Sequence, residues 1–363
     1  MILEAGVGTL ADGSAAIGTR LESVGAKIPE RILTTRDLME STRHHPHIEL
    51  ERLTGIHQRH VCSDGEDSFT LAVDAARDCL AHSRYGPEDI EMLINCSISR
   101  NKGGLRHQWE PPLSLSVKDA IGAHKAISFD LSNACAGMMS GVFVLHDFIR
   151  RGVIRRGMVV SGEYISSLAQ NAAEQVRWVL SQQLASLTLG DAGTAAIVER
   201  AESDADQIAV AGFATLSEHS RLCLGAPSMV GPGASMFTKA RTIHQVAISE
   251  SPPLLKEALE AAGLDFGEID YVIPHQTSVR AIEKGTKELS ERLGVAPKHM
   301  VVTVDEFGNT SSTTHFVALR KYLREQRFEK GDTIMLISFA SGLEVGVIIF
   351  PVEEILDRYG HDD

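Results

Sequence analysis

A chain of 363 residues is long enough to build two core-bearing halves or one large composite domain. Its composition, 43% hydrophobic and 23% charged, is that of an ordinary soluble globular protein, and a formal net charge of −13 disfavours a general nucleic-acid surface. No stretch is long and apolar enough to span a bilayer and no signal-peptide pattern is present, so we expect no membrane insertion.

Predicted strands and helices alternate along the chain with short connections, which predicts a layered α/β protein. The expected strands are 21–24, 92–97, 126–131, 158–162, 195–198, 208–214, 271–273, 300–304, 333–338 and 345–350. Expected helices include 68–82, 138–148, 252–262, 278–293 and 313–325. No Pro- or Gly-rich linker divides the chain, and the polar segment 199–207 is the boundary that we expect between two parts.

The number and spacing of the cysteines indicate the redox state of the compartment in which the protein works. They are an odd, scattered set without CxxC spacing, which favours reduced thiols over a disulfide framework. They are Cys62, Cys79, Cys96, Cys135 and Cys223. We therefore expect a cytoplasmic protein.

Cys135 is the most informative residue. It follows the predicted strand 126–131, and it precedes a small-residue turn and the predicted helix 138–148. A cysteine at a helix N-terminus lies at the positive end of the peptide dipoles, which stabilise the reactive thiolate. The position suits covalent catalysis, with a buried structural cysteine as the alternative.

Two polar side chains farther along the chain also follow predicted strands. His275 comes directly after the run 271–274, and Asn309 lies in a Gly-flanked turn after the strand 300–304. Ligands of open α/β sheets bind at the carboxyl ends of strands. A Cys, a His and an Asn that each follow a strand end indicate one catalytic site, although a core histidine and a turn asparagine explain each of the last two alone.

Several short runs of residues resemble, in order and spacing, the motifs of the β-ketoacyl-acyl-carrier-protein synthase III family of the thiolase superfamily. The resemblance covers nearly the whole chain and is more specific for the superfamily than for the reaction. The runs are Ile28-Pro29-Glu30, Thr54-Gly55-Ile56 with Arg59, Asn133-Ala134-Cys135-Ala136-Gly137, Leu189-Gly190-Asp191-Ala192-Gly193-Thr194-Ala195-Ala196, His275-Gln276 with Arg280, and Gly308-Asn309-Thr310-Ser311.

The resemblance implies a thiolase-type layered α-β-α-β-α fold built from two pseudo-repeated halves. Residues 1–200 would form the N-terminal half with the nucleophilic cysteine, and residues 201–363 the C-terminal half with the His and the Asn. It also implies a homodimer.

The resemblance also implies a mechanism. Cys135 would take the acyl group from a thioester, with the backbone N–H groups of Cys135 and Gly342 as oxyanion hole. Gly342 is the one glycine left where the family usually has three. His275 and Asn309 would hold the carbonyl oxygen of a second thioester while its enolate forms and attacks the acyl-cysteine. This mechanism needs no metal or redox cofactor. Its substrates would be borne on acyl carrier protein or coenzyme A.

Some positions depart from the family pattern. Glu49 and Leu53 stand where bacterial fatty-acid initiators bind the adenine of coenzyme A, which favours a carrier-protein donor or different coenzyme A contacts. Thr277-Ser278 replaces the usual Ala-Asn after His-Gln. Arg280 matches an arginine that contacts the acidic carrier protein near the tunnel mouth.

Glu110 stands where the initiators have an apolar residue that reaches across the dimer. A Glu-Pro at this place resembles the head-to-head condensing enzymes of olefin biosynthesis, in which the glutamate is a base for a second acyl chain. Glu110 would then be a general base contributed in trans, or a group that binds a polar acyl chain; an exposed loop glutamate is the alternative.

We therefore expect an acyltransferase that joins two acyl thioesters by Claisen condensation, with a malonyl-type second substrate, in specialised fatty-acyl or polyketide biosynthesis. The alternatives are head-to-head condensation without decarboxylation and acyl transfer to a hydroxyl or amine acceptor. A non-catalytic partner subunit is less consistent with the intact Cys135.

Overall fold

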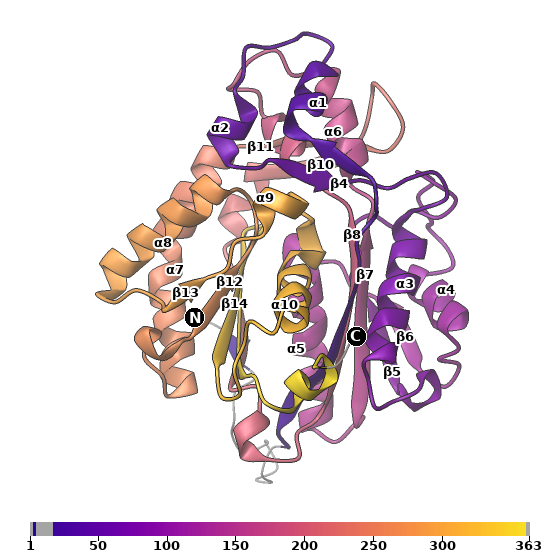
Figure 1. Cartoon of the computed structure of the whole chain (residues 1–363), viewed down its shortest axis with the longest axis vertical. Coiled ribbons are helices and arrows are strands. Elements are labelled where there is room, and N and C mark those ends of the chain that lie inside the picture. Colours follow the sequence, from indigo (N-terminus) through magenta and orange to yellow (C-terminus); the bar gives the residue numbers. More distant parts are fainter. Residues whose placement is uncertain (1–2, 5–16, 361–363) are drawn as a thin grey trace.

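Two mixed β-sheets with the same internal order form the framework of the chain, of which the computed structural model describes residues 3–4 and 17–360 (Figure 1). The first sheet contains, in spatial order, β2 (Thr19–Lys27), β8 (Ala192–Arg200), β7 (Arg156–Glu163), β5 (Met92–Asn95) and β6 (Ile127–Asp130). The second contains β1 (Leu3–Glu4), β9 (Val210–Thr215), β15 (Glu344–Pro351), β14 (Thr333–Ala340), β12 (Tyr271–Pro274) and β13 (His299–Met300).

The two sheets repeat one topology. β5 lies between the parallel strands β6 and β7, and β12 lies in the same way between β13 and β14. The next two pairings in each sheet are antiparallel, β7–β8 and β8–β2 in the first, β14–β15 and β15–β9 in the second. Apart from the edge strand β1, each sheet is drawn from one continuous part of the chain, as two pseudo-repeated halves require.

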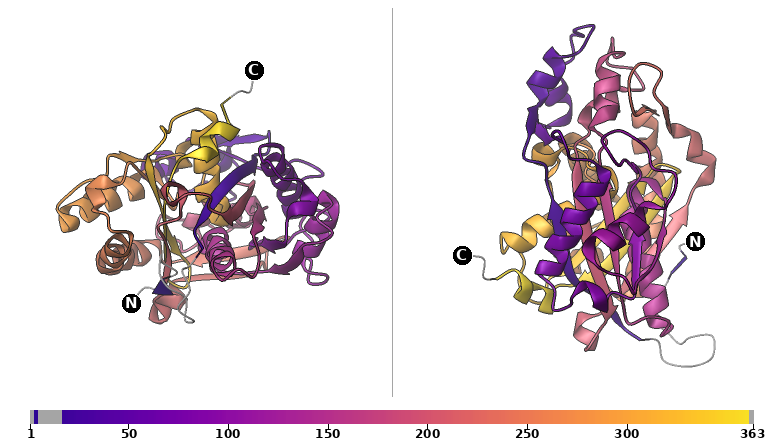
Figure 2. Two further views of the ribbon diagram at one scale, coloured as in Figure 1. Left: turned by 90° about the horizontal axis from the view of Figure 1, so that it is seen from below. Right: turned by 90° about the vertical axis from the view of Figure 1, so that its right-hand side faces the viewer.

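Helices cover both faces of both sheets (Figures 1 and 2). α5 (Gly137–Arg150) and α10 (Thr314–Arg324) lie between the sheets and share one apolar core with both of them. α3 (Ser68–Ala81) and α4 (Leu113–Ile121) cover the outer face of the first sheet, and α7 (Ala240–Ala262) and α8 (Val279–Leu293) that of the second. Strands buried on both faces are mainly apolar, as β5 and β14 are. The expected α-β-α-β-α layering is confirmed.

Shorter elements gather at one end of the molecule, above the carboxyl ends of the central parallel strands (Figures 1 and 2). Some of them, β3, α1, α2 and α6, contribute to a small apolar cluster that includes Leu38, Leu50 and Leu187. They are β3 (Ile32–Thr34), α1 (Thr35–Glu40), α2 (Leu50–Thr54), β4 (Gln58–His60), α6 (Ser166–Ala173), β10 (Cys223–Pro227), β11 (Ala234–Thr238) and α9 (Val304–Phe307).

Two sequence-based boundaries are wrong by four residues or more. The strand expected over 300–304 ends at Met300, because the N–H groups of Thr303 and Val304 donate to the side chain of Gln276 instead of to a strand. The helix expected from residue 252 begins at Ala240, so Pro252 and Pro253 lie inside it. Within residues 3–4 and 17–360, no helix is long and apolar enough to cross a membrane.

Candidate active site

Cys135 lies in a single 3-10 turn, Ala134–Ala136, that joins β6 to the buried helix α5. Ala134 adopts a left-handed backbone conformation with φ of 44°. Gly137 then allows the turn to approach β5 closely, because a Cβ there would lie 2.8 Å from the carbonyl oxygen of Cys96. The local chain therefore places the thiol at the N-terminal end of α5, where the sequence predicts it.

The electrostatics of the thiol differ from the sequence expectation. Burial raises the pKa of Cys135 to about 12, although a hydrogen-bond contact with Ser311, Sγ to Oγ 3.4 Å, acts in the opposite direction. Desolvation disfavours the charged thiolate, which the position at a helix N-terminus alone would favour. Cys135 therefore rests as a thiol.

His275 follows β12, and hydrogen bonds of its own backbone and of the Gln276 side chain hold its loop. The backbone N–H of His275 donates to the carbonyl of Ile337 on β14 (2.9 Å). The Gln276 side chain donates to the carbonyl of Val301 (3.0 Å) and accepts from Thr303 N–H (2.8 Å), which ties the His275 loop to the segment before α9. These contacts fix the His275 backbone at the carboxyl end of the second sheet, and the side chain lines a cavity.

The imidazole of His275 is neutral. Burial lowers its pKa to about 3, and the nearby ring of His315, with a centroid separation of 5.9 Å, adds to the effect. His315 is itself buried, its pKa is about 4, and its Nε2–H donates to the Ile337 carbonyl at 3.0 Å. A neutral imidazole can donate one N–H to a developing oxyanion without first losing a proton.

Backbone hydrogen bonds to the turn before β8, which contains the sequence motif Leu189-Gly190-Asp191, hold Asn309 in place. Asn309 N–H donates to the Thr188 carbonyl (2.9 Å), and Gly190 N–H donates to the Asn309 carbonyl (3.1 Å). A Cβ on Gly190 would lie 2.2 Å from the carbonyl oxygen of Phe307, so only glycine permits this approach. Ser311 N–H donates to the Asn309 side-chain oxygen (2.9 Å), which leaves the NH₂ group as the free end of the amide.

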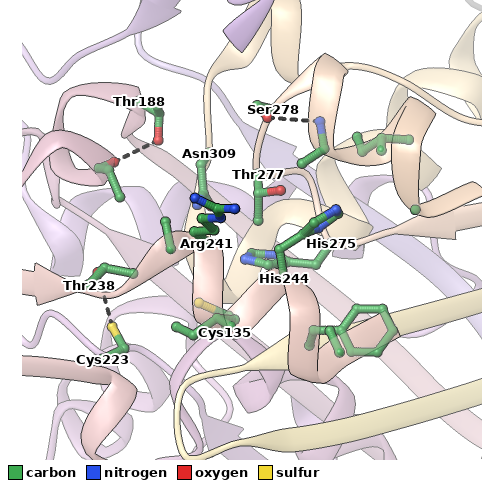
Figure 3. Close-up of a pocket in the computed structure, with 18 of the residues that line it drawn as sticks. Cys135, Thr188, Cys223, Thr238, Arg241, His244, His275, Thr277, Ser278 and Asn309 are labelled. Carbon is green, nitrogen blue, oxygen red and sulfur yellow. Dashed lines mark hydrogen bonds between the residues drawn. The ribbon is translucent and has the colours of Figure 1, made fainter. Parts of the chain in front are cut away.

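One cavity of about 640 Å³ contains all three side chains (Figure 3). Cys135, His275 and Asn309 come from both halves of the chain and line the same space. Thr277, Ser278 and two groups that the sequence did not single out, Arg241 and His244 of α7, also line it. The arrangement provides a nucleophile and two neutral N–H donors in one cavity, the requirement for acyl transfer through a stabilised oxyanion.

A buried carboxylate supports the loop that carries Asn309. Glu163, at the end of β7, accepts hydrogen bonds from Ser312 Oγ, from Ile98 N–H (2.9 Å) and from Ser99 N–H (3.1 Å). Burial raises the pKa of Glu163, while these hydrogen bonds oppose the increase. Sequence reasoning missed Glu163 and His315, because their roles depend on contacts between distant segments and no local motif marks them.

The remaining predicted residues lie around the cavity or away from it. Gly342 occupies the turn between β14 and β15, whose neighbours Ala340 and Ser341 line the cavity. Glu110 is exposed in the loop before α4 and is not part of the cavity wall. Arg280 is exposed in the first turn of α8, where it pairs with Glu283 (3.1 Å) beside a second, shallower hollow.

The residues that depart from the family pattern have identifiable positions and contacts in the structure. Ser278 is the N-cap of α8, and its hydroxyl accepts from Ala281 N–H (3.1 Å). Glu49 pairs with Arg52 (2.8 Å) at the surface, and Leu53 is 49% exposed. Among residues 3–4 and 17–360 no cluster of His, Cys, Asp and Glu has the arrangement of a metal site.

Comparison with known proteins gives a consistent result. Residues 129–216 match the family model of 3-oxoacyl-[acyl-carrier-protein] synthase III, and residues 259–352 match the model of its C-terminal region. A β-ketoacyl-[acyl-carrier-protein] synthase III of Symbiobacterium thermophilum is 31% identical over 341 residues, 90% of this chain and 96% of the relative. A relative of the same name from Acidiphilium cryptum is 30% identical over 332 residues, 90% of this chain and 97% of the relative.

Solved structures share the fold. An OleA variant of Xanthomonas campestris superposes with a TM-score of 0.80 at 22% identity, covering 93% of this chain and 98% of that one. The priming β-ketosynthase from the R1128 polyketide biosynthetic pathway superposes with a TM-score of 0.79 at 25% identity, covering 93% and 97%.

Proposed function

Since the chain belongs to the β-ketoacyl-acyl-carrier-protein synthase III family of condensing enzymes, we propose that it joins two acyl thioesters at the cavity of Cys135, His275 and Asn309. The observation that carries the proposal is that a thiol and two neutral N–H donors, from different halves of the chain, line one space. The proposed product is a β-ketoacyl thioester of specialised fatty-acyl or polyketide metabolism.

The first step is acylation of Cys135. Its sulfur attacks the carbonyl carbon of the incoming thioester, the carbon–sulfur bond to the carrier breaks, and the thiol proton leaves with the carrier as a free thiol. Because the pKa of Cys135 is high, the proton departs during the attack, and the Ser311 hydroxyl is the group nearest to accept and relay it. The backbone N–H groups of Cys135 and Gly342 are the proposed donors to the oxyanion.

The second step is formation of an enolate. The neutral His275 and the free NH₂ of Asn309 donate to the carbonyl oxygen of the second thioester. A malonyl-type substrate reaches the enolate by losing CO₂. Its carbon then attacks the acyl-cysteine, the new carbon–carbon bond forms, and Cys135 is released and reprotonated. Each oxyanion donor contributes on the order of 3 kcal/mol to such a step.

An alternative route needs a base instead of a leaving carboxylate. Glu110 lies exposed on a loop that contains Gly103 and Gly104, both in left-handed conformations, and the loop is accessible to a second protomer. In a homodimer Glu110 would remove the α-proton of a second acyl chain in the partner's site.

Acyl transfer to a hydroxyl or amine acceptor would use Cys135 and His275 in the same way. The proposed donor is acyl carrier protein or coenzyme A, with Arg280 as a contact to an acidic carrier.

Intact-protein mass spectrometry tests the proposal. Incubation with an acyl thioester should add one acyl mass to the protein, and Cys135→Ala should abolish the adduct. Cys223→Ala is the matched control, because Cys223 faces the same cavity and its Sγ already contacts Thr238 Oγ1 at 3.3 Å. Discharge by a malonyl carrier alone supports decarboxylation, whereas discharge by a simple acyl thioester that requires Glu110 supports the head-to-head route. An adduct that survives in Cys135→Ala would contradict the proposal.

A further inference from the structure

The segment that follows α6 carries an exposed apolar turn. Trp178, Val179 and Leu180 are 62%, 47% and 74% exposed. Ser181 N–H donates to the Trp178 carbonyl (3.1 Å), so Val179 and Leu180 are the two central residues of a tight turn. Gly, Pro, Asn, Asp and Ser dominate such positions. Neither turn formation nor burial accounts for the apolar side chains here, which indicates that the turn contacts something outside the chain.

The turn forms part of the edge of the cavity. Val179 and Leu180 line the cavity that contains Cys135, and they are also exposed at the surface. The carbonyl of Gln182 accepts from Thr238 N–H (2.7 Å), which holds the segment against the end of β11. Apolar surface therefore continues from the outside of the molecule into the cavity.

Cations without an ionic partner lie beside the turn. Arg177 precedes it directly, and Lys239 and Arg241, at the start of α7, line the same cavity (Figure 3). All three side chains are exposed, and within the described part of the chain none of them forms an ion pair. Arg52 and Arg280, by contrast, each pair with a glutamate. This edge of the cavity is therefore cationic, although the whole chain has a net charge of −13.

An exposed Trp, aliphatic side chains and unpaired cations are together the composition of a peripheral membrane-binding site. The set, which we name the cavity rim, comprises Arg177, Trp178, Val179, Leu180, Lys239 and Arg241. We propose that the cavity rim docks the protein on an anionic lipid bilayer. The contact is peripheral and needs no membrane-spanning helix. It goes beyond the proposed function, because it gives an apolar chain a path between a lipid phase and the cavity.

A bilayer accounts for the rim more fully than an acidic carrier protein does. The cations alone would be enough to attract an acidic protein. Peripheral membrane binding, however, depends on buried apolar area as well as on attraction to anionic lipids. Trp178, Val179 and Leu180 supply that apolar area, and Arg177, next to them in the chain, supplies charge. An acidic carrier protein is therefore the competing outcome of the test.

The tryptophans of the chain provide a direct test, because Trp109 and Trp178 are the only two. Trp109→Phe leaves Trp178 as the single fluorescent reporter in the cavity rim. Trp178→Phe leaves Trp109, which is 83% exposed in the loop before α4, as the control reporter. Each protein is titrated with vesicles of phosphatidylglycerol or of phosphatidylcholine, with and without brominated acyl chains, at low and at high salt.

We expect phosphatidylglycerol vesicles to shift the emission of Trp178 to the blue and brominated chains to quench it, with no such change for Trp109. Each Lys or Arg near an anionic surface strengthens binding about fivefold, so phosphatidylcholine should bind on the order of 100-fold more weakly. High salt should reduce this difference.

Variants in the Trp109→Phe protein separate the two contributions. Arg177→Gln should weaken binding to phosphatidylglycerol about fivefold, and Leu180→Gln about tenfold. Val153→Gln is the matched control, because Val153 is also exposed (57%) but precedes β7, at the opposite end of the molecule from the cavity. It should leave vesicle binding unchanged.

Several results would overturn the inference. An unshifted Trp178 in the presence of phosphatidylglycerol vesicles would show that the rim does not meet a bilayer, and an equal shift of Trp109 would show non-specific adsorption. A shift of Trp178 with an acidic acyl carrier protein but not with vesicles would assign the rim to a protein partner. Equal weakening by Leu180→Gln and Val153→Gln would remove the rim from the contact. Vesicle binding needs no substrate, so failure of Cys135 to form an acyl adduct would refute the proposed function alone.

Discussion

The thiol of Cys135 lies 3.4 Å from the hydroxyl of Ser311, and the two residues belong to equivalent turns of the two halves. Each lies in a 3-10 turn, 134–136 or 311–313, that leads into one of the two central helices, α5 or α10. Ala134 and Ser311 both adopt left-handed backbone conformations, with φ of 44° and 59°. The repeated topology therefore brings the two turns together at the point where the reaction takes place.

Ser311 should assist ionisation of the nucleophile. Its hydroxyl contact lowers the pKa of Cys135 against the effect of burial, so Ser311→Ala should raise that pKa further. Loss of a hydrogen bond of about 1 kcal/mol slows thiol alkylation about fivefold at a fixed pH. The pH dependence of iodoacetamide labelling of Cys135 measures this. The backbone N–H of Ser311 still positions Asn309 in the variant, so an unchanged labelling profile would contradict the role.

The two buried histidines should make stability dependent on pH. Their pKa values, about 3 for His275 and about 4 for His315, lie below the unfolded value of 6.5, so the unfolded state binds more protons as the pH falls. The contribution of the two neutral histidines to the free energy of unfolding is therefore complete above pH 6.5. It is lost as the pH falls toward their pKa values in the folded protein. His275 alone should cost about 2 kcal/mol at pH 5 relative to pH 7.

Urea unfolding at pH 7 and pH 5 tests this dependence. His275→Asn removes the titrating group, so the loss of stability between the two pH values should become smaller than in the unaltered protein. The same loss in both proteins would show that His275 is solvated and does not contribute.

Glu163 should be required for the geometry of the Asn309 loop. Glu163→Gln replaces one accepting oxygen by an NH₂ group, so either the contacts of Oε1 with Ser312 and Ile98 or that of Oε2 with Ser99 are lost. We expect a loss of about 1–3 kcal/mol in unfolding free energy and slower discharge of the acyl adduct. Acylation should slow as well, because the same loop carries Ser311, whose hydroxyl contacts the Cys135 thiol. Discharge at the normal rate would contradict the assignment to the loop.

Gly190 should be irreplaceable. Gly190→Ala places a Cβ 2.2 Å from the Phe307 carbonyl oxygen and separates the turn from the Asn309 segment. Such overpacking costs about 1–3 kcal/mol or more, measurable by thermal unfolding. Gly86→Ala is the control, since its nearest contact would be the Asp89 side chain at 3.7 Å and its φ of −90° suits any residue. Similar stability of the two variants would disprove the close approach.

The sequence predicts the layered fold and three side chains of the cavity, because strand patterns are local and each of these residues follows a strand closely. It does not predict the ionisation state of Cys135, since desolvation depends on how segments far apart in the sequence enclose the thiol. The sequence does not reveal Glu163 and His244 either, because no local motif marks them and their positions depend on how distant segments pack. The segment 300–304 has strand composition, yet the Gln276 side chain takes the hydrogen bonds that a strand would need.

The central claim is that Cys135 carries the acyl group, whereas His275 and Asn309 hold the carbonyl oxygen of the second thioester. Variants of His275 and Asn309 test this claim most directly. His275→Ala and Asn309→Ala proteins are loaded with an acyl thioester, and the mass of the peptide that contains Cys135 is followed after addition of the second thioester. The account predicts that both variants form the Cys135 adduct at near the normal rate and retain it, whereas the unaltered protein discharges it. Normal discharge by either variant, or failure of both to load Cys135, would contradict the account.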